Sequence, residues 1–357
     1  MSSHLKSSAG HLELVRGANL YRVAIVGAAT LKGKEIAEVL NDRNFPSLDV
    51  KLLDEESLGQ LETLGDEVSF IQSLRADQFD KVDFAFFASD QENTLKNWKM
   101  ARDAGSAIVD VSFALEEEAG AVVRAPWVER QRGRTMPPEL QPAPVVVAHP
   151  AAVVLAVLLL GAQKAGKIKH AVVTVFEPAS ERGQKGMDEL HEQTVNLLSF
   201  QQLPKAVYDT QVAFNLVARY GDEAVPTLGT IEQRVIRHYK LIAGDDAPVP
   251  SILLVQAPIF HGHALAIHLE MEQTADLEAV SQAVTGDHVA VTRLAEESPS
   301  NVNAAGQGDV LVSMAPDSNQ ANGLWLWVAT DNLRIAASTA VECAESMTAT
   351  RPRGKIQ

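Results

Sequence analysis

The sequence predicts an α/β protein of two domains, a doubly wound parallel sheet followed by an α+β domain. The chain has 357 residues, which exceeds the usual limit of a single hydrophobic core. Its first part alternates short apolar runs with amphipathic stretches, as in parallel sheets covered by helices on both faces. Beyond residue 165 strand-like segments predominate and helices become few, which is typical of an α+β domain.

In the first domain, four apolar runs have the length of buried strands. They are residues 23–26, 50–53, 84–87 and 107–110, with helices predicted at 33–41 and 94–104. The proline-rich stretch from residue 124 to 144 is interpreted as a long surface connection that leads to a further strand at 145–148.

The second domain is predicted to be a mixed sheet. Its expected strands are residues 170–176, 252–257, 264–271, 310–314 and 324–329, with helices near 185–198 and 277–283. We expect residues 1–19 to be a flexible tail, 20–150 the first domain, 151–331 the second, 332–347 a helix that packs back on the first domain, and 348–357 a second flexible tail.

Composition excludes several classes of function. A net charge of −15 disfavours binding to nucleic acid and to anionic membranes. Cys343 is the only cysteine, so an intramolecular disulfide is impossible and a cytoplasmic location is expected. The apolar run 145–162 contains His149-Pro150, which favours a strand, a break and a buried helix over a membrane span.

A glycine turn follows the first strand and opens the first helix. Glycines at such a turn let the backbone approach a pyrophosphate at the helix N-terminus. Here Gly27 and Gly33 are present, but Thr30 stands at the middle position, where its side chain takes up space next to the backbone. Two interpretations remain open: a tight turn with no ligand, and a Rossmann-type site with weakened cofactor binding.

Acidic residues follow the second strand. Asp54 and Glu56 are placed to bond the ribose hydroxyls of NAD, and they would repel the additional phosphate of NADP. The sequence therefore predicts weak binding of NAD at most, and it disfavours NADP.

Four stretches of the chain resemble the aspartate-semialdehyde dehydrogenase family. They are the turn 27–33; Glu177-Pro-Ala-Ser-Glu-Arg-Gly-Gln-Lys-Gly-Met-Asp-Glu-Leu190 with Gln193-Thr194; Ala257-Pro-Ile-Phe-His-Gly-His263; and Thr330-Asp-Asn-Leu-Arg334. The resemblance covers about residues 21–347. It implies a Rossmann-type first domain and a homodimer formed by the second domain. It also implies reductive dephosphorylation of aspartyl phosphate with NADPH through a cysteine thioester.

The resemblance also places the site residues, and most depart from the family's pattern. The cysteine nucleophile at a helix start is matched by Ala152, whereas the acid/base histidine is retained as His263. The two arginines that hold the substrate carboxylate and phosphate are matched by Gln256 and Glu116, and the glutamine beside the thioester by Glu177. The arginine that contacts the NADP phosphate is matched by Glu56. An anionic acyl phosphate would therefore meet carboxylates.

Three functions follow from this pattern. The first is a catalytically inactive Usg-type paralogue with a binding, regulatory or dimer-scaffold role, as a homodimer or as a heterodimer with a related dehydrogenase. The alternative is an NAD-dependent aldehyde oxidoreductase that uses His263 as acid/base without a thioester. The third is a scaffold without a ligand. No metal site is predicted, because His261 and His263 share one strand face whereas His268 lies on the other.

Overall fold

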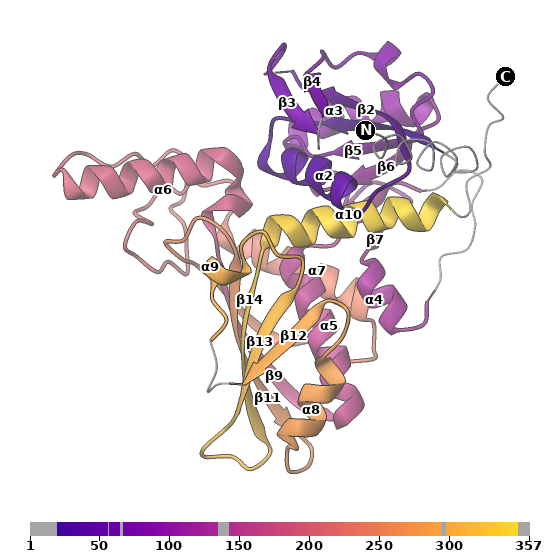
Figure 1. The fold of residues 1–357 in the computed structure, drawn as a ribbon. Coiled ribbons are helices and arrows are strands. Elements are labelled where there is room, and N and C mark those ends of the chain that lie inside the picture. The colour runs from indigo at the N-terminus through magenta and orange to yellow at the C-terminus, as the bar shows by residue number, and fades with distance from the viewer. Residues whose placement is uncertain (1–19, 56, 65–66, 135–142, 294–297, 349–357) are drawn as a thin grey trace, which may run out of the picture.

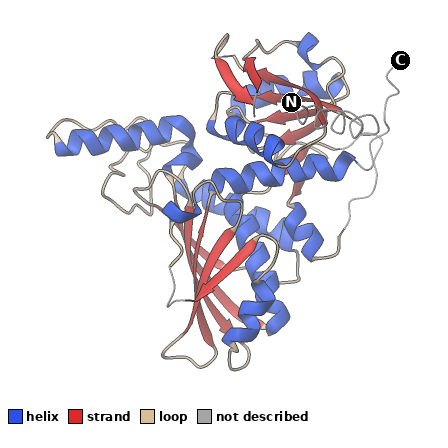
Figure 2. Ribbon diagram, in the orientation of Figure 1, coloured by secondary structure: helices blue, strands red, loops and turns tan. Residues whose placement is uncertain are grey.

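The fold consists of two six-stranded sheets, one in each half of the molecule, with a long C-terminal helix between them (Figures 1 and 2). The computed structural model describes residues 20–55, 57–64, 67–134, 143–293 and 298–348. The predicted flexible tail 1–19 lies outside these residues, and so do residues 349–357 of the predicted tail 348–357; Thr348 is the last residue of the C-terminal helix. The α/β class is confirmed, with one parallel and one mixed sheet.

The first sheet is entirely parallel, in the order β2-β1-β5-β6-β8-β7. Its strands are β1 (Tyr21–Val26), β2 (Ser47–Leu53), β5 (Phe84–Phe87), β6 (Ala107–Asp110), β7 (Val122–Arg124) and β8 (Val145–Val147). A separate hairpin pairs β3 (Leu61–Leu64) with β4 (Glu67–Phe70), and the helical segments are α2 (Leu31–Asp42), η1 (Ala76–Phe79), α3 (Gln91–Asp103) and α4 (Pro126–Gln131). The strand order reverses between β1 and β5, so the glycine turn after β1 lies where open α/β sheets bind ligands.

One part of the first domain differs from the sequence prediction. Residues 124–144 were expected to form a surface connection, yet β7 adds a strand at the sheet edge and α4 follows it. The side chains of Trp127 and Val128 are buried. Pro126 is the first residue of α4, a position where proline starts a helix instead of breaking one.

The second sheet has the order β10-β9-β11-β14-β13-β12 and mixed direction. Its strands are β9 (Ile168–Glu177), β10 (Ser251–Gln256), β11 (His263–Met271), β12 (Val289–Arg293), β13 (Val310–Pro316) and β14 (Gly323–Thr330). The accompanying helices are α5 (Pro150–Ala165), η2 (Ala179–Arg182), α6 (Gly183–Leu198), α7 (Leu228–Ala243), α8 (Leu277–Val284) and α9 (Asn301–Ala304). α5, α7 and α8 pack together and share one core with the buried face of the sheet.

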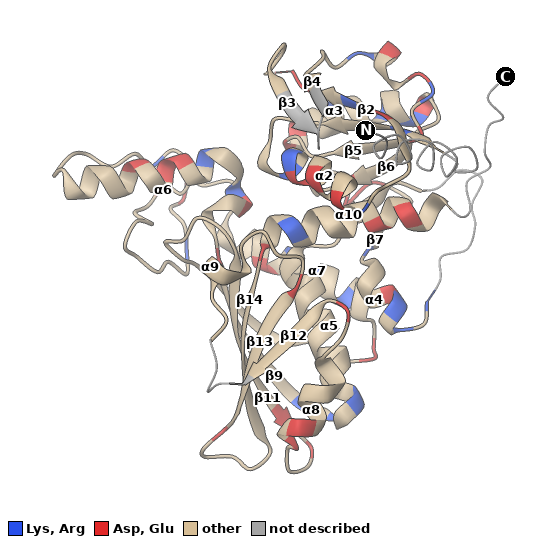
Figure 3. Cartoon of the chain, in the orientation of Figure 1, with Lys and Arg blue, Asp and Glu red and all other residues tan. Residues whose placement is uncertain are grey.

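The opposite face of this sheet is apolar and open. Side chains alternate between faces along a strand, so Val173 is buried whereas 53% of Val172 is exposed. The strand register sets His268 opposite both Val172 and Trp325, and Trp325 and Leu253 are about half exposed. Figure 3 shows few charged residues on these strands. We name this surface, made of Val172, Leu253, His268, Trp325 and Trp327, the open sheet face.

The last helix joins the two halves. α10 (Asn332–Thr348) packs along α2, and its Arg334 donates to Glu35 of α2 at 2.9 Å. It also contacts α4, α5 and the strands β6 and β8. Within the described residues, no helix is long and apolar enough to cross a bilayer.

Candidate functional site

The glycine turn is held by hydrogen bonds within the protein. Thr30 is the N-cap of α2, and its Oγ1 accepts from the Gly33 N–H and lies 2.8 Å from the Gly27 carbonyl oxygen. Gly27 has φ +79°, and a Cβ there would lie 2.4 Å from the backbone nitrogen of Ser89. A Cβ at Gly33 would lie 2.1 Å from the Gly27 oxygen. Local packing therefore requires both glycines with or without a ligand.

Asp54 lies beside this turn. Only 9% of the residue is exposed, and its Oδ2 accepts from the Ala29 N–H at 3.3 Å. The carboxylate therefore faces the turn backbone, close to where the sequence places a ribose. Glu56, the second predicted contact, lies outside the described residues.

Lys32 reaches from the start of α2 toward the second domain. Its Nζ donates to the Val111 carbonyl oxygen at 3.2 Å, lies 4.6 Å from the Phe113 ring centroid and is 3.8 Å from Glu181. Burial opposes ionisation of Glu181, yet the charge of Lys32 and the nearby histidines hold its pKa at about 2. Sequence reasoning missed this pair, although Lys32 lies within the glycine turn itself.

The start of α5 is where the resemblance places the nucleophile. His149 is the N-cap, and its Nδ1 accepts from the Ala151 N–H at 3.3 Å. The His149 N–H in turn donates to Nδ1 of His238 at 3.0 Å. Ala152 is fully buried in the core. The methyl group at this position offers no atom that can attack a carbonyl.

His263 and Glu177 form a buried pair. His263 Nε2 lies 2.9 Å from Glu177 Oε2, and both side chains are fully buried. Burial alone would lower the pKa of His263, but the hydrogen bond and charge of Glu177 outweigh it and raise that pKa. Burial also raises the pKa of Glu177. The pair therefore retains a proton, which is the property that acid/base chemistry needs.

Gln256 extends this hydrogen-bonded group. Its Oε1 accepts from the Tyr220 hydroxyl at 2.6 Å, and its Nε2 donates to the carbonyl oxygens of Glu177 and Ala257 at 3.0 and 2.9 Å. The amide thus has protein partners at both ends. A substrate carboxylate would have to displace them.

Glu116 lies in an ion-pair cluster between the domains. Its carboxylate accepts from Arg234 at 2.9 Å, pairs with Arg237 and lies 3.2 Å from His238 Nε2. Burial opposes ionisation, but these three partners hold the pKa of Glu116 far below its usual range. The expectation that a substrate anion would meet unbalanced carboxylates is wrong at this position, because α7 supplies two arginines.

The Phe113 ring contacts residues of both groups. Its ring lies 5.5 Å from the His149 ring at an interplanar angle of 21°, and Lys32 and Arg234 approach it within 4.6 and 4.9 Å. Its φ of +65° is rare for a bulky residue. Such strain persists only where the surroundings hold it, and it concentrates at functional sites.

The structure thus joins some predicted residues and separates others. One hydrogen-bonded group contains His263, Glu177 and Gln256. Glu116 is instead bound to the side chains of α7. His268 lies apart on the open sheet face and bonds Asp317 at 3.0 Å. Cys343 is buried in α10, where burial raises the pKa of its thiol to about 12. A buried thiol with a raised pKa is a poor nucleophile.

Comparison with known proteins identifies the family. Residues 22–136 match the model "Semialdehyde dehydrogenase, NAD binding domain" and residues 159–335 match "Semialdehyde dehydrogenase, dimerisation domain". A USG-1 protein homolog of Azotobacter vinelandii is 30% identical over 334 residues, which is 90% of this chain and 96% of that protein. The chain belongs to the semialdehyde dehydrogenase family.

Within this family, relatives with two different names match almost the whole chain. The aspartate-semialdehyde dehydrogenase of Rickettsia bellii is 29% identical over 337 residues, covering 92% of this chain and 97% of that protein. Aspartate semialdehyde dehydrogenase II of Vibrio cholerae, solved in complex with ASA, superposes with a TM-score of 0.81 at 25% identity and covers 93% of this chain and 99% of that structure. The two-domain semialdehyde dehydrogenase architecture is therefore confirmed, with an NAD-binding and a dimerisation domain.

Proposed function

We propose that this protein is a catalytically inactive member of the semialdehyde dehydrogenase family that acts as a dimeric binding or regulatory protein. The observation that carries the proposal is Ala152 at the start of α5. The only thiol of the chain, that of Cys343, is buried in α10. Without a thiolate at the start of α5 no thioester can form, so the covalent intermediate of the family's reaction cannot arise in this protein.

The contacts around the site support the same proposal. Glu116 is bound by Arg234 and Arg237, and the cation of Lys32 lies over the Phe113 ring. A substrate anion would need the cations of Arg234, Arg237 and Lys32, and each of these side chains already has a partner within the chain. The pairing is therefore a second, independent obstacle to substrate binding.

The open sheet face gives the proposed dimer its interface. A contiguous apolar surface on a sheet favours association with another chain. The family model for this half of the chain is a dimerisation domain, so we propose that a second copy covers the face. A heterodimer with a related dehydrogenase would use the same surface.

Cofactor binding is the next test. Lys32 Nζ donates to the Val111 carbonyl oxygen. Because this ammonium group is engaged within the protein, we expect a dinucleotide to bind weakly. Asp54 favours NAD over NADP. The purified dimer should be titrated by calorimetry with NAD, NADH and NADPH. Weak binding of NAD or NADH, or none at all, agrees with the proposal. Tight NADPH binding would contradict it.

The buried pair favours one alternative, an NAD-dependent aldehyde oxidoreductase. His263 and Glu177 retain a proton in a site without water-exposed atoms, as a general acid requires. One assay distinguishes the two functions. The protein is tested for oxidation of aldehydes with NAD in the absence of phosphate. Turnover that His263→Gln abolishes would support the oxidoreductase. No such turnover would support the binding protein.

A further inference from the structure

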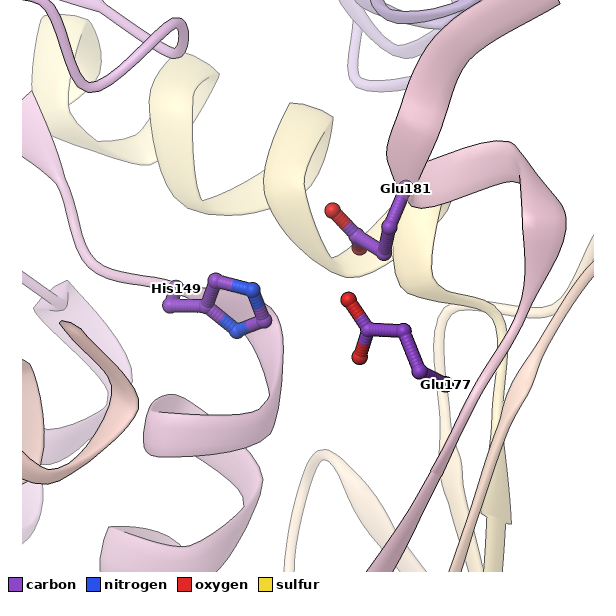
Figure 4. A group of neighbouring side chains, drawn as sticks. All are labelled: His149, Glu177 and Glu181. Carbon is purple, nitrogen blue, oxygen red and sulfur yellow. The ribbon is translucent and has the colours of Figure 1, made fainter. Parts of the chain in front are cut away.

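Three buried side chains point toward one another at the junction of α5, β9 and η2. His149, Glu177 and Glu181 each offer one ligand atom, and these atoms lie within 4.8 Å of one another (Figure 4). We propose that this group binds one divalent transition-metal ion of the Zn²⁺ or Mn²⁺ type. Imidazole nitrogen is a usual ligand of Zn²⁺, and carboxylate oxygen is a usual ligand of both Zn²⁺ and Mn²⁺.

An unsatisfied atom in the group gives an independent reason to expect a ligand. Glu177 Oε2 is bonded to His263, but Glu177 Oε1 is buried without a hydrogen-bond partner. Leaving a buried carboxylate oxygen without a partner destabilises the fold. An ion at the centre of the group would bind this oxygen.

The surroundings match those of metal sites in proteins. A ligating carboxylate is usually fixed by an outer hydrogen bond, and His263 supplies one to Glu177 at 2.9 Å. Glu181 receives a second from the Asn332 side-chain N–H at 2.9 Å. Donor atoms around one Zn²⁺ lie about 3–3.5 Å apart, so the group has to contract by a small movement.

Two contacts oppose the ion and set its affinity. The ammonium group of Lys32, 3.8 Å from Glu181, competes for the same carboxylate. Nδ1 of His149 accepts from the Ala151 N–H at 3.3 Å. If the other ring nitrogen binds the ion, Nδ1 carries the proton and this long contact is lost. Because Lys32 competes for Glu181, removing its charge should strengthen binding of the metal ion.

The test uses the full-length protein after removal of metal with EDTA. Calorimetric titration with ZnCl₂, MnCl₂ and MgCl₂ should show saturable binding of one Zn²⁺ or Mn²⁺ per chain, and no comparable binding of Mg²⁺, which prefers oxygen ligands. Glu181→Gln and His149→Asn should weaken the affinity at least about tenfold. Asn is a good N-cap residue, so the second variant keeps the start of α5.

Two further variants make the result decisive. His191→Asn, on the exposed surface of α6, should bind as the wild type does, which would show that binding does not depend on this surface histidine. Lys32→Met should bind more tightly, and this gain needs a folded protein. The proposal is overturned if the wild type binds no ion, if Glu181→Gln binds unchanged, or if Lys32→Met binds no more tightly. Because the readout is binding, it does not depend on the proposed lack of catalysis.

Discussion

His263 Nε2 lies 2.9 Å from Glu177 Oε2 in a pair from which water is fully excluded. In the family that the sequence resembles, a histidine and a glutamine occupy these positions. The exchange of the amide for a carboxylate changes the protonation of the histidine. A buried carboxylate favours the protonated imidazole, so the histidine becomes one half of an ion pair. In such a pair the histidine holds its proton more tightly than a free imidazole does.

This pair predicts a pH dependence of stability. The folded-state pKa of His263 is raised, so its stabilisation is fully present below the unfolded pKa of about 6.5 and is lost as the pH rises through the folded pKa. We expect the free energy of unfolding to fall above pH 6.5 in denaturant titrations. His263→Gln should flatten this slope. His149 and His238 have lowered pKa values, so their contributions have the opposite sign and fade as the pH rises above the unfolded pKa. An equal slope in wild type and variant would refute the ion pair.

The ion pairs of Glu116 predict an opposite dependence in acid. Its pKa is lowered, so the stabilisation is present above the unfolded pKa of about 4.3 and is lost as the pH falls below it. Glu116→Gln should lower the free energy of unfolding at pH 7 by about 1–3 kcal/mol and reduce the loss of stability in acid. Glu118→Gln, an acid that the structure pairs with neither arginine, is the matched control. Equal effects of the two substitutions would contradict the cluster's role.

Restoring the nucleophile should not restore the reaction. Ala152→Cys returns a thiol to the start of α5, but Glu116 remains bound to Arg234 and Arg237, and Gln256 remains bound to Tyr220. We expect no phosphate-dependent turnover of aspartate semialdehyde by this variant. Thiol titration in denaturant should count two thiols, Cys343 included, and circular dichroism would establish that the variant is folded. Measurable turnover would show that the substrate contacts are assigned wrongly.

The open sheet face predicts which substitution disrupts the dimer. Leu253→Glu places a charge in the proposed apolar interface, where an unpaired charge costs several kcal/mol. Sedimentation equilibrium should show a monomer at micromolar concentration for this variant and a dimer for the wild type. Leu95→Glu, at an equally exposed leucine on α3 (51% for each), should remain a dimer. Dimeric Leu253→Glu would place the interface elsewhere.

The sequence predicted the sheets well because their signals are local. The apolar runs 84–87 and 107–110 coincide with β5 and β6, and the helix 332–347 with α10. Turn glycines and apolar alternation are properties of a few neighbouring residues, so they can be read without a structure.

The site could not be predicted as completely, since its contacts join distant segments. Glu116 and Arg234 are 118 positions apart, and no pattern in either segment indicates that they meet. Lys32 and Glu181 form their pair across the two domains. The left-handed conformation of Phe113 also has no signal in the sequence, because it is imposed by the surrounding packing.

We propose that the family's reaction does not take place in this protein. The most direct test is the phosphate-dependent reduction of NADP⁺ or NAD⁺ by aspartate semialdehyde, followed at the absorbance of the reduced nicotinamide, with an active aspartate-semialdehyde dehydrogenase in parallel. We predict no turnover above the protein-free background at any concentration of phosphate. Turnover that saturates with both phosphate and semialdehyde, at a rate comparable to that of the active enzyme, would show that the protein catalyses the family's reaction.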